Sequence, residues 1–227
     1  MATVETWAIV VAAGEGTRLG SELPKAFVGL GGRPLLAHSI ELLDGHPAVD
    51  RIVLVVPEEW QEPATLLADE LVAGKVADAV AGGATRAHSV AAGLARVPEE
   101  AGVVLVHDAA RPLATAEMID RVLAGLVDAD GAIPGVPVCD TVKRVAQGRV
   151  ESTLDRSSLV AVQTPQAFRA DSLRAAYAGA SDLGSATDCA SVLEQAGLPV
   201  AVVDGDPRNI KVTTASDLER AEGELAG

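Results

Sequence analysis

Basic residues are scarce in this 227-residue sequence, and their scarcity excludes a nucleic-acid surface. The chain has 18 lysines and arginines against 32 aspartates and glutamates, which gives a formal net charge of -14. A protein that binds DNA or RNA needs clustered basic side chains to neutralise the phosphate backbone. The lysines are Lys25, Lys75, Lys143 and Lys211. Any anionic ligand must therefore meet positive charge that is concentrated locally.

Cysteines and long apolar runs are also few. Cys139 and Cys189 have neither the spacing of metal ligands nor the number needed for a disulfide framework, which favours a reducing compartment. No apolar run is long enough to cross a bilayer, and no basic segment precedes the first apolar run as it does in a signal peptide. We expect a soluble, cytoplasmic protein that does not contact membranes.

Short apolar runs that alternate with helical stretches make up most of the chain. With 48% hydrophobic residues, it has enough apolar side chains for one large core, and we expect a single domain over residues 1–227. The runs are apolar throughout, which is typical of parallel strands covered on both faces, so the pattern predicts a doubly wound α/β fold. The expected strands are 7–13, 51–57, 76–82, 102–108, 131–138 and 198–205. The expected helices are 35–43, 57–72, 85–95, 115–127, 171–178, 187–194 and 215–225.

One segment, residues 140–168, breaks this alternation. It contains two short alternating pieces around the sequence AQGR, which predicts a β-hairpin. An isolated hairpin is marginally stable in water, so we expect it to pack against a second copy of the chain. We assign residues 138–162 to this arm and expect a homodimer.

The first apolar run ends in the sequence VVAAGEGTRLG, which is typical of a loop that binds phosphate through its backbone. It lacks the G-K-[S/T] ending of a P-loop. Leu19 stands where a dinucleotide-binding loop has its third glycine, and no acidic residue ends the next strand. Two interpretations remain: a nucleotide cradle completed by Arg18 and Lys25, or an ordinary tight turn with a solvated arginine.

The segment VHDAARP follows another predicted strand, where ligands of α/β sheets bind. Asp108 could hold Mg²⁺ together with substrate phosphates, or it could cap a turn. Arg111 could bind phosphate or lie on the surface. His107 is expected to pack or to orient a neighbour. Further along, Thr164 is a possible substrate contact, and Pro165 could begin a helix.

Seven segments together identify a resemblance. In order, AAGEGTRLG followed by LPKAF, then GGATRAHSV, VHDAARP, DTVKR, DRSSLVAVQTPQAF, TDCASV and NIKVTT span nearly the whole chain. This series closely resembles the 2-C-methyl-D-erythritol 4-phosphate cytidylyltransferase family. The resemblance implies a Rossmann-like nucleotidyltransferase fold. It also implies transfer of the cytidylyl group of CTP to methylerythritol phosphate, with Mg²⁺ or Mn²⁺, in the non-mevalonate isoprenoid pathway.

The resemblance also implies roles for individual residues. Arg18, Lys25 and Lys211 would be catalytic, and Asp108 would bind the metal. The CTP phosphates and base would contact Ala12, Ala13, Gly14, Gly16, Gly82, Gly83, Ala84 and Ser89. Methylerythritol phosphate would contact Arg111, Thr164 and Lys211, together with Thr141 and Arg156 from the arm of the partner chain.

One position departs from the family pattern, and three other functions remain open. Relatives usually have a second acid where this chain has Cys189, which we expect to be a small buried residue, while Asp188 caps or orients. A cytidylyltransferase for ribitol 5-phosphate or another polyol phosphate would share these motifs. A catalytically silent nucleotide-binding module and a dinucleotide-dependent oxidoreductase are the alternatives from other classes.

Overall fold

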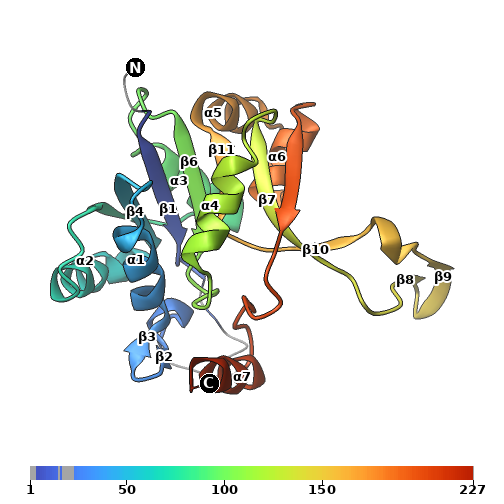
Figure 1. The fold of residues 1–227 in the computed structure, drawn as a ribbon, viewed down its shortest axis with the longest axis horizontal. Helices are drawn as coiled ribbons and strands as arrows, with labels where there is room; N and C mark the ends of the chain where they lie inside the picture. The colour runs from blue at the N-terminus through green and yellow to red at the C-terminus, as the bar shows by residue number, and fades with distance from the viewer. Residues whose placement is uncertain (1–3, 15, 17–22, 227) are drawn as a thin grey trace.

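A mostly parallel sheet runs through the computed structural model, which describes residues 4–14, 16 and 23–226 (Figure 1). Its order is β10-β7-β11-β6-β1-β4-β5, with β12 on the other side of β7. Neighbouring strands are parallel, except that β10 is antiparallel to β7 and β11 is antiparallel to both β6 and β7. The α/β fold predicted from the sequence is therefore confirmed. The strands are β1 (Thr6–Val11), β4 (Arg51–Val56), β5 (Val76–Ala81), β6 (Val103–Asp108), β7 (Gly131–Pro137), β10 (Val160–Val162), β11 (Gln166–Arg169) and β12 (Val200–Asp204).

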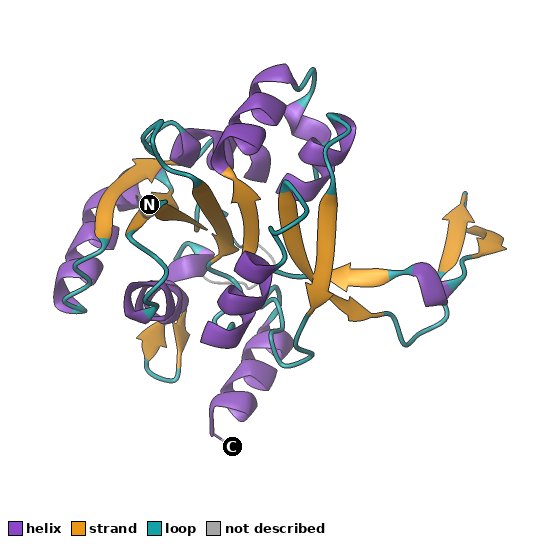
Figure 2. Cartoon of the chain, turned by 45° about the horizontal axis from the view of Figure 1, so that its top comes forward, coloured by secondary structure: helices purple, strands orange, loops and turns teal. Residues whose placement is uncertain are grey.

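Helices cover both faces of the sheet (Figures 1 and 2). On one face, α1 (Leu35–Gly45), α2 (Gln61–Glu70) and α4 (Ala116–Ala124) contribute to one apolar core. On the other, α3 (Arg86–Leu94), α5 (Ala170–Gly179) and α6 (Cys189–Gln195) contribute to a second core. All seven helices expected from the sequence are present, the last being α7 (Ala215–Ala226). No helix of the described residues is long and apolar enough to cross a membrane.

Burial differs between the centre and the edges of the sheet. The expectation that every strand is covered on both faces holds for β4 and β6 but is wrong for β5 and β12. Each of those two pairs with a single strand, and Val202 in β12 is 56% exposed. Their apolar sequence does not distinguish an edge strand from a central one.

The arm is the part of the fold that stands away from both cores (Figures 1 and 2). Strands β8 (Lys143–Ala146) and β9 (Arg149–Thr153) form the predicted hairpin, and every residue in them is exposed. Gln147 and Gly148 turn the chain with φ of 50° and 74°, as a tight hairpin turn requires. The chain returns through a short 3-10 helix, η4 (Arg156–Ser158), to β10.

The interpretation of Pro165 as the start of a helix is wrong. Pro165 follows a cis peptide bond, and the next residues form β11, which lies antiparallel between β6 and β7. Ala167 and Phe168 are fully buried there. A four-residue segment with only two apolar residues is too short for its periodicity to distinguish a strand from a helix.

Helix α7 and a two-stranded ribbon hold the segment that carries Lys211. Three further 3-10 helices and a two-stranded ribbon complete the fold: η2 (Lys25–Phe27), η3 (Glu58–Trp60), η5 (Leu183–Ser185), β2 (Gly29–Leu30) and β3 (Arg33–Pro34). Helix α7 packs over this ribbon, with Leu30, Leu35, Val212 and Ala221 fully buried between them.

Helix α7 begins with a reciprocal cap. The Thr214 hydroxyl accepts a hydrogen bond from the backbone N–H of Asp217 at 3.3 Å, and the Asp217 carboxylate accepts one from the N–H of Thr214 at 2.8 Å. Thr213 adds its own N–H at 2.9 Å. These bonds, above all the one from the Thr213 hydroxyl, lower the pKa of Asp217 from 3.8 to about 2. The cap therefore fixes Thr213 and Thr214, which directly follow Lys211 and Val212 in the chain.

Replacing this carboxylate should weaken the fold in a pH-dependent way. We expect Asp217→Asn to lower the free energy of unfolding by about 1 kcal/mol at neutral pH, a typical cost for a lost cap. A carboxylate with a lowered pKa stabilises the fold above its ordinary pKa, and that contribution is lost as the pH falls from 3.8 towards 2. Urea unfolding at pH 7, 4 and 3 should show the difference shrinking with acidity. Glu219→Gln, an exposed change on the same helix, is the control, and a difference independent of pH would contradict this account.

Candidate active site

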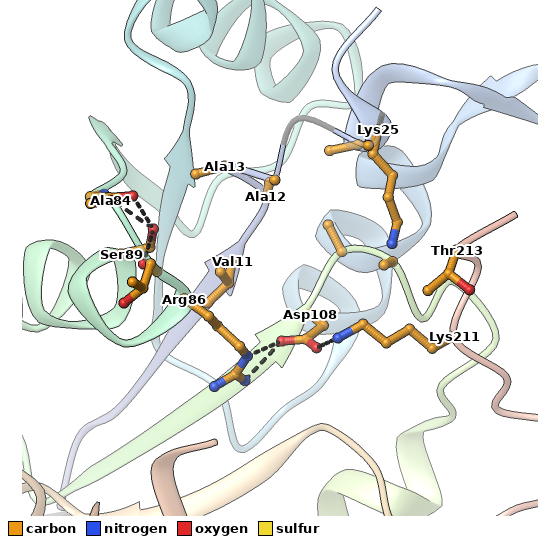
Figure 3. Close-up of a pocket in the computed structure, with 17 residues that line it drawn as sticks. Val11, Ala12, Ala13, Lys25, Ala84, Arg86, Ser89, Asp108, Lys211 and Thr213 are labelled. Carbon is orange, nitrogen blue, oxygen red and sulfur yellow. Dashed lines mark hydrogen bonds and ion pairs between the residues drawn. The ribbon is translucent and has the colours of Figure 1, made fainter. Parts of the chain in front are cut away.

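The loops at the carboxyl ends of β1 and β6 open onto a cavity of about 610 Å³ (Figure 3). The loop after β1 forms one wall, the start of α3 forms another, and the turn after β6 lies beside the segment that carries Lys211. In an open α/β sheet this edge is where ligands bind. Among the residues that line the cavity are Ala12, Ala13, Gly14, Gly16, Lys25, Gly83, Ala84, Ser89, Asp108 and Lys211. Most residues implied for nucleotide binding are therefore brought together.

Glycines allow the walls of this cavity to approach one another. A Cβ atom on Gly82 would lie 2.3 Å from the Cβ of Ala13, and one on Gly83 would lie 2.5 Å from the Cβ of His88. Gly16 has a φ of +69°, and a Cβ there would lie 2.5 Å from that of Lys25. Real Cβ atoms do not approach so closely. Backbone groups, instead of side chains, therefore form much of the surface that a ligand would meet.

Ser89 shapes the loop that faces the cavity. Its hydroxyl oxygen accepts a hydrogen bond from the N–H of Gly83 at 3.1 Å and donates to the carbonyl of Thr85 at 3.1 Å. Thr85 caps α3 by accepting from the N–H of His88. The serine is 3% exposed. Ser89 therefore holds the backbone of residues 82–84 in position beside the cavity.

A charged cluster closes the other side of the cavity. Asp108 accepts hydrogen bonds from the Nε of Arg86 at 2.8 Å and from the Nζ of Lys211 at 2.7 Å, one on each carboxylate oxygen (Figure 3). Burial alone would raise the pKa of Asp108, but the charges of Arg86 and Lys211 outweigh it and hold the pKa well below its ordinary value. Asp108 is therefore a fixed anion at neutral pH.

A second cavity of about 390 Å³ adjoins the first. Arg86, Asp108 and Lys211 line both cavities, and no other described residue does so. We call these three residues the partition. The second cavity is also lined by Arg111, Gln163, Thr164, Gln166, Thr187, Asp188, Ser191 and Glu194. Its lining combines cations, acids and neutral polar groups, a mixture suited to a phosphorylated molecule that carries hydroxyl groups.

Thr164 fixes the backbone beside the partition. Its hydroxyl oxygen accepts from the N–H of Asp108 at 3.0 Å and lies 3.2 Å from the Nδ1 of His107. The imidazole and the hydroxyl lie within hydrogen-bond distance, so each fixes the orientation of the other. Burial lowers the pKa of His107 to about 4. This histidine is neutral and fully buried, and it orients Thr164, as its place in the sequence predicted.

Arg111 uses its guanidinium to join two distant segments. Nη1 donates to the carbonyl of Asn209 at 2.8 Å and Nη2 donates to that of Val162 at 3.1 Å. Gln163 also donates to the Asn209 carbonyl, at 3.2 Å. The turn after β6, the end of β10 and the approach to Lys211 are thereby held together. Arg111 lines the second cavity while it makes these bonds.

The remaining sequence predictions fall in three places. Lys25 extends its amine into the first cavity, towards the region where Asp108 and Lys211 lie (Figure 3). Thr141 and Arg156 are exposed on the arm and line neither cavity, and Arg156 donates to the carbonyl of Cys139. Arg18 lies outside the described residues.

Sequence reasoning missed Arg86. It is the first residue of α3, directly after the cap Thr85, and its side chain reaches back to Asp108, 22 residues further along the chain. The available signal was an arginine within GGATRAHSV, three residues after a pair of glycines that directly follows a strand. Cys189 and Asp188 take the expected roles: the first is fully buried, and the second caps α6 with a reciprocal bond to Ser191.

Comparison with known proteins decides the family. The model of the 2-C-methyl-D-erythritol 4-phosphate cytidylyltransferase family matches residues 6–226. The chain belongs to this family. The 2-C-methyl-D-erythritol 4-phosphate cytidylyltransferase of Nocardia farcinica is 49% identical over 217 residues, which cover 95% of this chain and 91% of that protein.

Other family members extend the comparison to a fused enzyme and to a solved fold. The bifunctional enzyme IspD/IspF of Rhodospirillum rubrum is 45% identical over 216 residues, which are 95% of this chain and 56% of that protein. The crystal structure of 4-diphosphocytidyl-2C-methyl-D-erythritol synthase from Anaerococcus prevotii matches with a TM-score of 0.86 at 27% identity. That match covers 99% of this chain and 100% of the other, so the two proteins share their fold.

The close contact between Gly82 and Ala13 makes a prediction about stability. We expect Gly82→Ala to destabilise the protein by about 1–3 kcal/mol, because the added methyl must displace the loop after β1. Urea unfolding measures the change. Gly74→Ala is the matched control, since a Cβ there meets no atom within 4 Å. Equal unfolding midpoints for the two variants would show that the loop yields without cost.

Proposed function

We propose that this chain transfers the cytidylyl group of CTP to 2-C-methyl-D-erythritol 4-phosphate, and releases pyrophosphate. The product is 4-diphosphocytidyl-2-C-methyl-D-erythritol, an intermediate of the non-mevalonate isoprenoid pathway. Membership of the cytidylyltransferase family supports the reaction. The observation that carries it in the structure is the partition, because two adjoining cavities that share one charged wall provide for two anionic substrates that must meet.

The first cavity is assigned to CTP. Its backbone N–H groups and Lys25 suit a triphosphate, and we assign Arg18 to the same anion from the resemblance. The backbone of Gly82, Gly83 and Ala84, held by Ser89, is assigned to the pyrimidine. A surface built from closely packed glycines favours a small base over a purine.

The second cavity is assigned to methylerythritol phosphate. Lys211 stands between the two cavities, so its ammonium is placed to contact the phosphates of both substrates. Arg111 and Thr164 line the acceptor side. Both terminal nitrogens of the Arg111 guanidinium already donate to carbonyls. We therefore assign Arg111 an electrostatic attraction on the acceptor phosphate from its fixed position, more than direct hydrogen bonds to it.

The chemistry requires positioning and charge, without a general base. The attacking phosphate oxygen is already anionic, and charge moves onto the departing pyrophosphate in the transition state. Lys25 and Lys211, with Arg18, stabilise that charge. The reaction offers no proton for His107 to remove. This buried, neutral histidine instead serves to orient Thr164.

We propose that Mg²⁺ accompanies the nucleotide. Among the described residues there is no group of three or more His, Cys, Asp or Glu side chains that could hold a metal. Mg²⁺ is commonly bound by one or two carboxylates together with phosphates and water, and Asp108 supplies one such carboxylate. When bound, the ion would neutralise part of the triphosphate charge. Mn²⁺ favours the same oxygen ligands.

We also propose a homodimer in which each arm completes the partner's site. The exposed valines of the hairpin, Val145 and Val150, are 57% and 62% exposed in the single chain. Thr141 lies just before β8 and Arg156 shortly after β9, and both residues line neither cavity of their own chain. A second copy related by a two-fold axis would bring the arm of each chain to the other's acceptor cavity.

Pyrophosphate release tests the reaction directly. CTP, UTP, ATP and GTP are each combined with Mg²⁺ and either methylerythritol phosphate or ribitol 5-phosphate. We expect release only with CTP and methylerythritol phosphate. Release with ribitol 5-phosphate instead would move the protein to the related polyol activity. CTP binding without release would support a silent nucleotide-binding module, and binding of NAD(P) would support an oxidoreductase.

Subunit mixing tests the shared site. We expect Lys25→Ala and Arg156→Ala each to lower kcat by about 100-fold or more, as expected when one preorganised charge is removed from such a site. A mixture of the two variants should regain activity up to about a quarter of the wild-type value, because half of the dimers are mixed and one site in each is intact. Arg149→Ala, which removes another exposed arginine of the arm, is the control. If subunit exchange is verified and no activity returns, the arm does not complete the partner's site.

A further inference from the structure

Arg86 has no role in the reaction as described so far, although it forms part of the partition. It contacts the Oδ1 atom of Asp108 through Nε and Nη2, both at 2.8 Å, while Lys211 contacts the other oxygen. The two cations differ in exposure. The side chain of Arg86 is 20% exposed and that of Lys211 is 41% exposed. Lys211 therefore has room to move towards a ligand, while Arg86 is packed in place.

Two buried groups behind Arg86 hold its guanidinium. Nη1 donates to the sulfur of Cys189 at 3.7 Å, and the hydroxyl of Tyr177 lies 3.3 Å from the same sulfur. Burial raises the pKa of the Cys189 thiol, which therefore stays neutral at physiological pH. The guanidinium is thus fixed by an anion in front and by an uncharged pair behind (Figure 3 shows the front). Its charge is directed at Asp108.

The arrangement answers an electrostatic problem in the proposed reaction. If Lys211 turns from Asp108 to the phosphates of the two substrates, the carboxylate loses one of its two cations. Without Arg86, the buried carboxylate would then have no cation from the chain, which is strongly unfavourable, and it would either move or recapture the lysine. Arg86 stays bound to Asp108, because α3 and the groups behind its guanidinium hold it against the Oδ1 atom.

We infer that Arg86 is a positioning residue that keeps Asp108 fixed and charge-balanced, which leaves Lys211 able to bind phosphate across the partition. Cys189 and Tyr177 support it by fixing the guanidinium. This inference rests on the proposed function, since it assigns Arg86 a part in that reaction. It differs from a direct role, in which Arg86 would itself bind the triphosphate from the wall of the first cavity.

Steady-state kinetics of Arg86→Lys test the inference. A lysine keeps the charge but cannot bind Asp108 and Cys189 together. We expect kcat to fall by about 100-fold, as for other small displacements of catalytic groups. The KM for CTP should stay within about twofold, because the inference gives Arg86 no contact with the nucleotide, although it lines the same cavity. Arg96→Lys is the matched control, since Arg96 pairs with Asp78 on the surface.

A double-mutant cycle separates indirect from direct action. If Arg86 acts through Asp108, the variant Arg86→Lys with Asp108→Asn should have the same kcat as Asp108→Asn alone. Losses that multiply in the double variant, or a large rise in the KM for CTP, would instead show direct contact with the nucleotide and overturn the inference. A kcat for Arg86→Lys within about twofold of wild type would also overturn it.

A second variant covers the case in which Arg86→Lys does not fold, as judged by circular dichroism. Cys189→Ala leaves both ion pairs of Asp108 in place and removes only the support behind the guanidinium. We expect it to lower kcat without changing the KM for CTP, and an unchanged kcat would overturn the inference. The wild-type assay comes first. A wild-type chain that releases no pyrophosphate removes the proposed function as well, whereas failure of the inference alone shows only in the variants.

Discussion

The two ion pairs of Asp108 are the interaction on which the site depends. A carboxylate that is mostly buried at the end of β6 is held by one cation from α3 and by another from the segment before α7. The segment before α7 is distant in the sequence from both α3 and β6, and the ion pairs join it to them. The pairs place three charges along the boundary between two cavities. Without them, the two cavities would have no charged group in common.

The surrounding structure is arranged so that this boundary is rigid on one side and adaptable on the other. Thr164, which His107 orients, holds the backbone N–H of Asp108. Arg111 ties the approach to Lys211 to the end of β10. The cap at Asp217 fixes the chain just beyond Lys211. Lys211 is thus anchored at its backbone, while its side chain is the most exposed of the three in the partition.

The sequence was sufficient to predict the helices, the parallel strands and the arm, because their apolar patterns extend over many residues. It also placed Lys25, Asp108 and Lys211 at one site, since residues that follow parallel strands meet at the same edge of a sheet. Three features escaped for physical reasons. Strand β11 is too short to have a recognisable period, and Arg111 binds backbone carbonyls, which no sequence pattern marks. Arg86 was missed because its partner is set by the packing of α3 on the sheet.

The contact between Ala13 and Gly82 limits how the nucleotide cavity can evolve. A Cβ on Gly82 would lie only 2.3 Å from that of Ala13, and glycine has no side chain left to lose. A larger residue at position 13 therefore has no compensating substitution at position 82. A Cβ at position 82 would still lie 2.9 Å from the Ser89 hydroxyl oxygen even if position 13 became glycine. Widening the cavity for a bulkier base requires the backbone of two segments to separate, which point mutations in the lining cannot achieve one at a time.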